Sequence, residues 1–404
     1  MSSYRKLARK QAFRLGLAVT AMVGGMTGWH TAAYADGATD IQKMDAANAG
    51  TITTSNNVWT VVPDKVENDI ATNAFSKFVV NQNNVANLQM YKGGATANTL
   101  VNMVQGHIDI RGTVNVLKNA NTIGGNVFFL SPEGMAVGRT GVINAGSITA
   151  LTPSTDWFND HLQDKRVKVT AADMDALKAG TIPLNADGSI VIDGQLNAQS
   201  GIHLGAPAIT VGSAASTAAQ LTSQKNLNFA ALVNAGSTSA GLGTLTATTG
   251  AGGDIVLAAE SNRLNSTTDD VPKYANPLSG SKNEIKAELT VGKSARVTGD
   301  QNIALSSYAE HTADQSEAFG GTSSNTSAQL LGQIVKTTAH TTVNGTVTAD
   351  GRLSATAKAK NIASEAGPLS NAAGLADEVA GVIAVNVDPS YMIMGSEATV
   401  KIGA

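Results

Sequence analysis

The chain has 404 residues, a formal net charge of −3 and no cysteine, and only 4% of its residues are aromatic. A nearly neutral chain without a basic face or an acidic block argues against nucleic acid as a partner. The length would allow about two or three ordinary domains. Internal repeats nevertheless predict one repetitive fold, as the elements taken in chain order indicate.

Residues 1–35 have the pattern of a cleaved signal peptide. Basic residues between Arg5 and Arg14 precede an apolar stretch at residues 15–28, and Ala33 and Ala35 form an A-x-A cleavage site before Asp36. The apolar stretch holds about 14 residues, fewer than the ~20 that span a membrane as a helix. We therefore expect delivery by the Sec machinery and exclude this segment from the fold.

The sequence contains no cysteine, as expected for an exported chain that crosses a second membrane unfolded. A disulfide formed in the periplasm would close a loop too bulky to thread. Chance composition is the alternative explanation.

Residues 124–151 are the most informative stretch. Apolar runs at residues 127–130, 135–137, 142–143 and 148–151 are separated by turn residues at 131–134, at Gly138 and at Gly146. Runs this short favour strands that pair with a coil above and a coil below. The pattern predicts an all-β fold, a right-handed parallel β-helix.

Residues 129–138 (FLSPEGMAVG) and residues 142–150 also carry a family resemblance. They are similar to the F-L-I-N-P-N-G-I-x-F-G hallmark of filamentous-haemagglutinin-type exoproteins, in the variant form of leukotoxin-family filamentous adhesins. The likeness continues upstream through residues 75–81 and 100–114 and covers roughly residues 50–155. This chain departs from the family in having Ser-Pro-Glu-Gly for Asn-Pro-Asn-Gly and no second Asn-Pro-Asn-Leu motif.

The resemblance implies a two-partner secretion exoprotein, secreted or displayed on the surface of a diderm bacterium by way of the periplasm. Its partner would be an outer-membrane β-barrel transporter, and a host receptor or glycan would be bound by the adhesive or toxic filament. Transporter recognition is expected at Asn126, Ser131, Pro132, Glu133, Gly134 and Asn144. We expect residues 131–134 to form an exposed corner.

The implied organisation has four parts: signal peptide 1–35, secretion domain with cap 36–155, helical or loop insertion 156–189, and stalk repeats 190–404 that continue beyond the chain end. The cap is expected at about residues 47–88, because an uncovered first coil would expose strand edges. In the insertion, Thr170 and Asp173 form a capping-box start for a helix to Lys178, with Gly180 as its stop.

Short imperfect sequence repeats predict that the solenoid continues after the secretion domain. Asn144, Asn197 and Asn234 each follow an apolar residue and precede Ala. Stacked coils would align them in a hydrogen-bonded ladder, although an Asn-rich composition alone could produce the pattern. Residues 261–282 are predicted to form a surface loop, and residues 320–327 and 365–380 loose loops or weak coils.

Catalytic signatures are missing. The six His residues form no metal-binding pair, there is no Cys nucleophile or G-x-S-x-G, and Gly250 to Gly253 lack the Lys of a phosphate loop. We expect no enzyme, cofactor or metal, and interpret Asp109 and Arg111 as an outer polar pair. The alternative is an extracellular β-helix polysaccharide lyase or hydrolase, whose candidate carboxylates are Asp254, Glu260, Asp269, Asp270 and Glu284.

Overall fold

The computed structural model describes residues 39–45, 49–213, 219–227, 229, 250–264, 280–313, 332–363 and 391–403. These residues belong to one compact unit, Thr39–Ala404. Within them there are two helices, α2 (Thr155–Asp160) and α3 (Ala171–Ala179), both in the part of the chain where helices were predicted. Neither of these described helices has the length and apolar character needed to cross a membrane.

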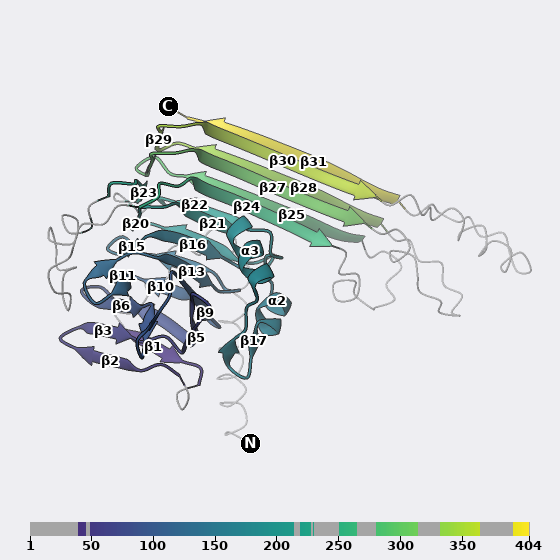
Figure 1. Cartoon of the computed structure of the whole chain (residues 1–404). Coiled ribbons are helices and arrows are strands. Elements are labelled where there is room, and N and C mark those ends of the chain that lie inside the picture. Colours follow the sequence, from purple (N-terminus) through teal and green to yellow (C-terminus); the bar gives the residue numbers. More distant parts are fainter. Residues whose placement is uncertain are drawn as a thin grey trace, which may run out of the picture. The chain divides into compact units, whose positions relative to one another are not determined.

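The chain winds into coils that each give one strand to each of three faces, which we name A1, A2 and B (Figure 1). Neighbouring strands within a face always pair in parallel, which confirms the predicted all-β fold as a parallel β-helix. Face A1 contains residues 70–75 of β5 (Ile70–Val80), β9 (Thr99–Val104), β13 (Asn126–Leu130), β16 (Ser147–Leu151), β21 (Ile202–Ala206), β24 (Ile255–Leu264), β27 (Ile303–Ala313) and β30 (Leu353–Ala363).

The other two faces follow the same order along the chain. Face A2 contains residues 78–80 of β5, β10 (Ile108–Ile110), β14 (Met135–Val137), β19 (Ser189–Ile192), β22 (Ala208–Val211), β25 (Gly280–Val291), β28 (Gly332–Val343) and β31 (Tyr391–Ile402). Face B contains β3 (Val58–Val61), β6 (Val85–Gln89), β11 (Thr113–Asn119), β15 (Val142–Ala145), β20 (Gln195–Ala198), β23 (Gln220–Ser223), β26 (Arg296–Gly299) and β29 (Thr346–Ala349).

The core consists of apolar side chains stacked from coil to coil. On face A1 one register position is occupied in turn by Leu100, Val127, Ile148, Ile202, Ile255, Ile303 and Leu353. All are buried except Leu353, on the last described strand of this face, which is 50% exposed. Each fully buried aliphatic side chain contributes about 1.5–3 kcal/mol. The aromatic residues Phe75, Phe78 and Phe129 fill the first coils by edge-to-face contact.

The first coil is closed by antiparallel strands, as the cap prediction requires. β1 (Asp40–Lys43) pairs with the second half of β5, β4 (Lys65–Glu67) pairs with its first half, and β2 (Ile52–Ser55) pairs with β3. β1 lies upstream of the range predicted for the cap. Strand edges that would otherwise be free on the amino-terminal side of the first coil are therefore hydrogen-bonded.

Short strands complete the described elements. β7 (Tyr91–Lys92) and β8 (Ala95–Thr96) form a hairpin, as do β17 (Leu162–Gln163) and β18 (Arg166–Val167), while β12 (Thr122–Ile123) pairs with β11.

The later coils have much longer strands on faces A1 and A2, which stack in chain order in Figure 1. Strand pairing continues to Leu264 in β24 and starts at Gly280 in β25. The prediction of a surface loop at residues 261–282 is therefore wrong at both ends, because residues 261–264 and 280–282 belong to strands. Small buried residues such as Ala259, Ser261 and Ala287 line the interior there. Residues 265–279 lie outside the described part of the chain, as do the predicted loops at 320–327 and 365–380.

A second core covers the outer side of face A1. Between β16 and β19 the chain leaves the solenoid and returns, carrying α2 and α3. Their side chains and Ile182 pack against outward residues of β9, β13 and β16 in one buried cluster: Val101, Met103, Phe128, Leu130, Leu151, Phe158, Met174, Leu177 and Ile182. Thr170 and Asp173 form the predicted capping box of α3, and Gly180 ends it in the left-handed region with φ of 69°.

Candidate functional site at the corner between β13 and β14

The corner of interest is the turn from Ser131 to Gly134, which joins β13 on face A1 to β14 on face A2. The Gly134 N–H donates to the Ser131 carbonyl oxygen at 3.1 Å, which closes a four-residue turn. Pro132 stands at the second turn position, where its fixed φ suits the bend. The Ser131 hydroxyl accepts from the Glu133 N–H at 3.2 Å and donates to the Gly106 carbonyl oxygen at 2.9 Å.

Gly134 is required at the end of this turn. Its φ of +93° is rarely adopted by residues with a side chain. A Cβ placed there would lie 2.0 Å from the carbonyl oxygen of Ser189 in the next coil. The following coil thus packs directly on the glycine.

Hydrogen bonds connect the corner to the coils on both sides. Towards the preceding coil, His107 donates its N–H to Glu133 Oε2 at 2.9 Å and its Nδ1–H to the Glu133 carbonyl oxygen at 3.0 Å. Towards the following segment, Asn185 Nδ2 donates to the Pro132 carbonyl oxygen at 2.9 Å. Hydrogen bonds at the corner therefore connect three segments of the chain: the one with His107, the turn itself and the one with Asn185.

The expected exposure of this corner is wrong for most of it. Ser131 is 1% exposed, and Pro132 and Gly134 are also buried, since the neighbouring coils and Asn185 cover them. Glu133 is the exposed member, and His107 beside it is partly exposed. The surface that a partner can reach here is a carboxylate next to an imidazole.

The two remaining predicted recognition residues lie elsewhere. Asn126, at the start of β13, accepts a 2.8 Å hydrogen bond from the Ser147 hydroxyl on the outer side of face A1. Asn144 lies in β15 on face B and is 1% exposed. The structure therefore brings Ser131 to Gly134 together but does not place Asn126 and Asn144 with them in one patch.

Asn144 belongs instead to the predicted ladder. Side-chain amides donate from Asn115 to Asn87 at 3.1 Å, from Asn144 to Asn115 at 2.9 Å and from Asn197 to Asn144 at 2.9 Å. Asn144 and Asn197 were expected, whereas Asn87 and Asn115 were missed because no Ala follows either. Asn234 lies outside the described residues. The shared signal is an Asn between apolar residues in a face-B strand.

A groove of about 330 Å³ lies on the outer side of face A1, beside the end of α3. Asn126, Lys178, His203 and Asp254 are among its lining residues. Burial lowers the pKa of His203, although a hydrogen bond to the backbone of Lys178 opposes this effect. A Cβ at Gly180 would lie 2.4 Å from the His203 ring, so the helix end sits tightly on the imidazole.

A second groove, of about 460 Å³, lies between the β4–β5 hairpin and the insertion. Here the His161 ring stacks on Trp157 with centroids 4.0 Å apart, and its Nε2 lies 3.2 Å from Asp173 Oδ1. Burial opposes ionisation of Asp173, but hydrogen bonds from Thr170 and His161 outweigh it and lower the pKa of Asp173.

The candidate carboxylates of a polysaccharide lyase or hydrolase do not cluster among the described residues. Asp254 Oδ1 accepts from the backbone N–H of Asn302 at 3.0 Å, a turn contact just before β24. Glu260 lies further along β24, in register with Tyr308, and burial raises its pKa. The side chain of Glu284 and both Asp269 and Asp270 lie outside the described residues. No group of three or more potential metal-binding side chains occurs among the described residues.

Asp109 and Arg111 form the predicted polar pair on face A2. Arg111 Nη2 lies 2.7 Å from Asp109 Oδ2, and both side chains are largely covered.

The fold and corner define a capped parallel β-helix with a helical insertion on one face. No protein-family model matches the chain, and no curated protein matches it. Six chains among the solved structures match. One is described as the "Crystal structure of filamentous hemagglutinin secretion domain", with 13% identity and a TM-score of 0.33, covering 81% of this chain and all of that chain.

Proposed function

We propose that this chain is an exported β-solenoid exoprotein of the two-partner secretion type, whose amino-terminal region is captured by an outer-membrane β-barrel transporter. The supporting observation is where the residues of the family resemblance lie. Residues 129–138 contain the end of β13, the Ser131–Gly134 turn, in which only Glu133 is exposed, and β14. On face A1, β13 follows the capped strand β5 and then β9. In this proposal the transporter contacts Glu133 and His107, which do not contribute to the buried core of the corner.

The cap gives the solenoid a direction of growth. β1, β2 and β4 pair with the amino-terminal edges of the first coil, so each further coil can add only on the carboxy-terminal side. Each added coil buries apolar side chains at about 25 cal/mol per Å². Folding outside the cell would therefore draw the chain outward without nucleotide hydrolysis.

The remaining described coils would form the stalk of a surface filament, adhesive or leukotoxin-like, after Sec delivery to the periplasm and cleavage after Ala35. The predicted cleavage residues Ala33, Ala35 and Asp36 lie outside the described part of the chain. A host receptor or glycan would be bound by the displayed filament.

The test is secretion of the full chain from a diderm host with and without its transporter, measured as protein in the medium and in the periplasm. We expect release only with the transporter. Glu133→Gln should lower release while leaving the unfolding temperature unchanged. The matched control is Glu67→Gln, an exposed carboxylate on β4, which should be released normally. Equal release without the transporter would refute the proposal.

A further inference from the structure

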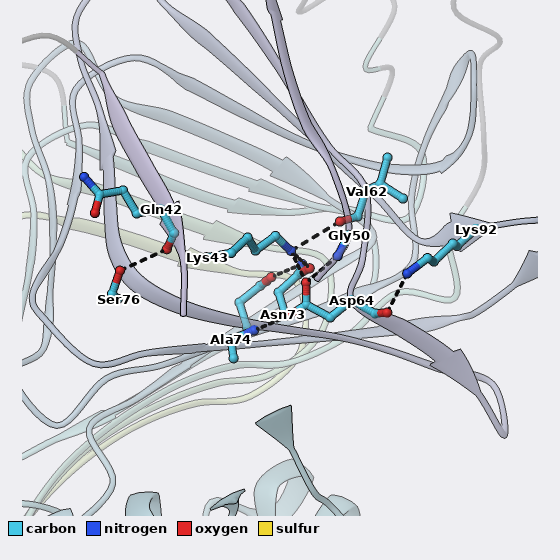
Figure 2. Close-up of polar contacts among 10 residues, drawn as sticks. Gln42, Lys43, Gly50, Val62, Asp64, Asn73, Ala74, Ser76 and Lys92 are labelled. Atoms are coloured by element: carbon cyan, nitrogen blue, oxygen red, sulfur yellow. Dashed lines mark hydrogen bonds and ion pairs between the residues drawn. The ribbon is translucent and has the colours of Figure 1, made fainter. Parts of the chain in front are cut away.

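A buried cluster in the cap brings together Lys43, Asp64 and Asn73 from separate segments (Figure 2). Lys43 ends β1, Asp64 lies between β3 and β4, and Asn73 lies within β5. The Lys43 side chain is 4% exposed and the Asp64 side chain 13%. Lys43 Nζ lies 2.6 Å from Asp64 Oδ1, donates to Asn73 Oδ1 and donates to the Val62 carbonyl oxygen at 3.2 Å.

Burial disfavours the charged form of Lys43, whereas two contacts favour it. Its Nζ lies 4.7 Å from the centroid of the Phe75 ring and 2.6 Å from Asp64 Oδ1. Burial lowers the pKa of Lys43 to about 8, although Asp64 opposes this shift. A pKa near 8 leaves roughly a tenth of the side chains as neutral amine at pH 7. A neutral lysine amine is a nucleophile.

The other two side chains are held in fixed orientations. Asn73 Nδ2 donates to Asn102 Oδ1 at 2.8 Å, which directs the Asn73 carbonyl towards Lys43. Asp64 accepts from the Gly50 N–H at 3.0 Å and from the Ala74 N–H at 2.8 Å. Asn73 is fully buried, so water does not compete for its carboxamide.

We propose that Lys43 and Asn73 form an intramolecular isopeptide bond, with Asp64 as the proton-transfer group. Lys43 gives a proton to the Asp64 carboxylate, and its neutral Nζ attacks Cγ of Asn73. The Asp64 carboxyl then protonates the departing amide nitrogen. Asp64 takes up one of the two protons still on the attacking nitrogen and transfers it to the released ammonia, which leaves as ammonium. A Cγ–Nζ bond forms, the Cγ–Nδ2 bond breaks and one ammonia leaves, so no oxidant or other reagent is consumed.

Such a bond would join the first strand of the cap covalently to β5. The three groups meet only in the folded cap, so the chain stays free of cross-links until it folds. This gives a chain without cysteine a covalent cross-link that forms only after folding. The inference is independent of the proposed secretion function.

The test is tryptic peptide mapping of the purified full chain by mass spectrometry. A free Lys43 gives separate peptides 44–65 and 66–77. Trypsin does not cleave after an acylated Lys43, so the peptide that contains Lys43 continues to Lys65 and carries peptide 66–77 through the bond to Asn73. The mass of this joined species is lower than the sum of its two peptides by about 17 Da, one ammonia. We expect the joined species. Cleavage at Lys43 with both peptides separate would overturn the proposal and leave an ordinary buried ion pair.

Variants assign the roles. Lys43→Arg and Asp64→Asn should give separate peptides, because the first removes the nucleophile and the second the proton acceptor. Lys92→Arg is the matched control: Lys92 donates only to the Asp64 carbonyl oxygen in this cluster, at 2.7 Å, so the joined species should persist. A joined species in Asp64→Asn would refute the role given to Asp64. The wild-type result does not depend on whether any variant folds.

Discussion

Replacing Asn144 with Ala tests whether the asparagine ladder stabilises the solenoid. Asn144 donates to Asn115 Oδ1 and accepts from Asn197 Nδ2, both at 2.9 Å, and all three side chains are buried. The substitution leaves one acceptor and one donor without these partners. Because an unsatisfied buried polar group costs about 1–3 kcal/mol, we expect a loss of about 2–6 kcal/mol in the free energy of unfolding.

Urea denaturation followed by far-UV circular dichroism measures this loss, with an unchanged dependence on urea concentration showing that the unfolded state is unaffected. The matched control is Lys118→Ala, an exposed residue on β11, which should change stability by less than about 0.5 kcal/mol. If Asn144→Ala costs no more than Lys118→Ala, the ladder is a consequence of composition and our energetic argument fails.

Two further predictions concern tight packing at the corner and at the insertion. Gly134→Ala should destabilise the fold strongly, because its Cβ would lie 2.0 Å from the Ser189 carbonyl oxygen. Gly93→Ala is the control: Gly93 has a φ of +58° and nothing within 4 Å of its Cβ position, so the substitution should cost only about 1–2 kcal/mol. Equal shifts of the two variants in thermal unfolding would contradict this prediction. His203 has a lowered pKa in the folded state, so the stability that its neutral form contributes is present above about pH 6.5 and lost as pH falls through the folded pKa. The protection of α3 amides against hydrogen exchange, taken relative to the intrinsic exchange rate at each pH, should therefore fall on acidification, and His203→Gln should remove that dependence.

The elements that could be predicted from sequence are those with local signals. Thr170, Asp173 and Gly180 define the start and end of α3 through backbone hydrogen bonds and a left-handed residue within a few positions. The short strands β13 to β16 could be predicted because each is an apolar run bounded by Gly or Pro.

The extension of β24 and β25 could not be predicted in this way. Residues 260–263 are polar, with no apolar alternation to reveal a strand. Closely packed sheets accept small polar residues because small side chains let the backbones approach. Thr341 illustrates this, since its hydroxyl hydrogen-bonds with the Ser307 hydroxyl at 2.9 Å and with the Thr356 carbonyl oxygen at 2.7 Å inside the structure.

The burial of the corner was missed for a different reason. A Ser-Pro-Glu-Gly turn is normally exposed, and nothing near it in sequence indicates that Asn185 and Ser189 return to cover it after the insertion. The cluster of Lys43, Asp64 and Asn73 is likewise invisible in sequence, because its members belong to segments with no common motif.

The cap and the corner together explain how the fold can start at one end. Strands β1, β2 and β4 remove the edges from which coils could grow in the amino-terminal direction, and Lys43 fastens β1 to β5 through Asp64 and Asn73. The turn at Ser131 to Gly134 then fixes the spacing between the coil before it and the coil after it. A chain that emerges amino terminus first would thus complete a closed template before its later coils appear. The later coils have longer strands and small interior residues such as Ala259, Ser261 and Ala287, and their local sequence signals are weaker.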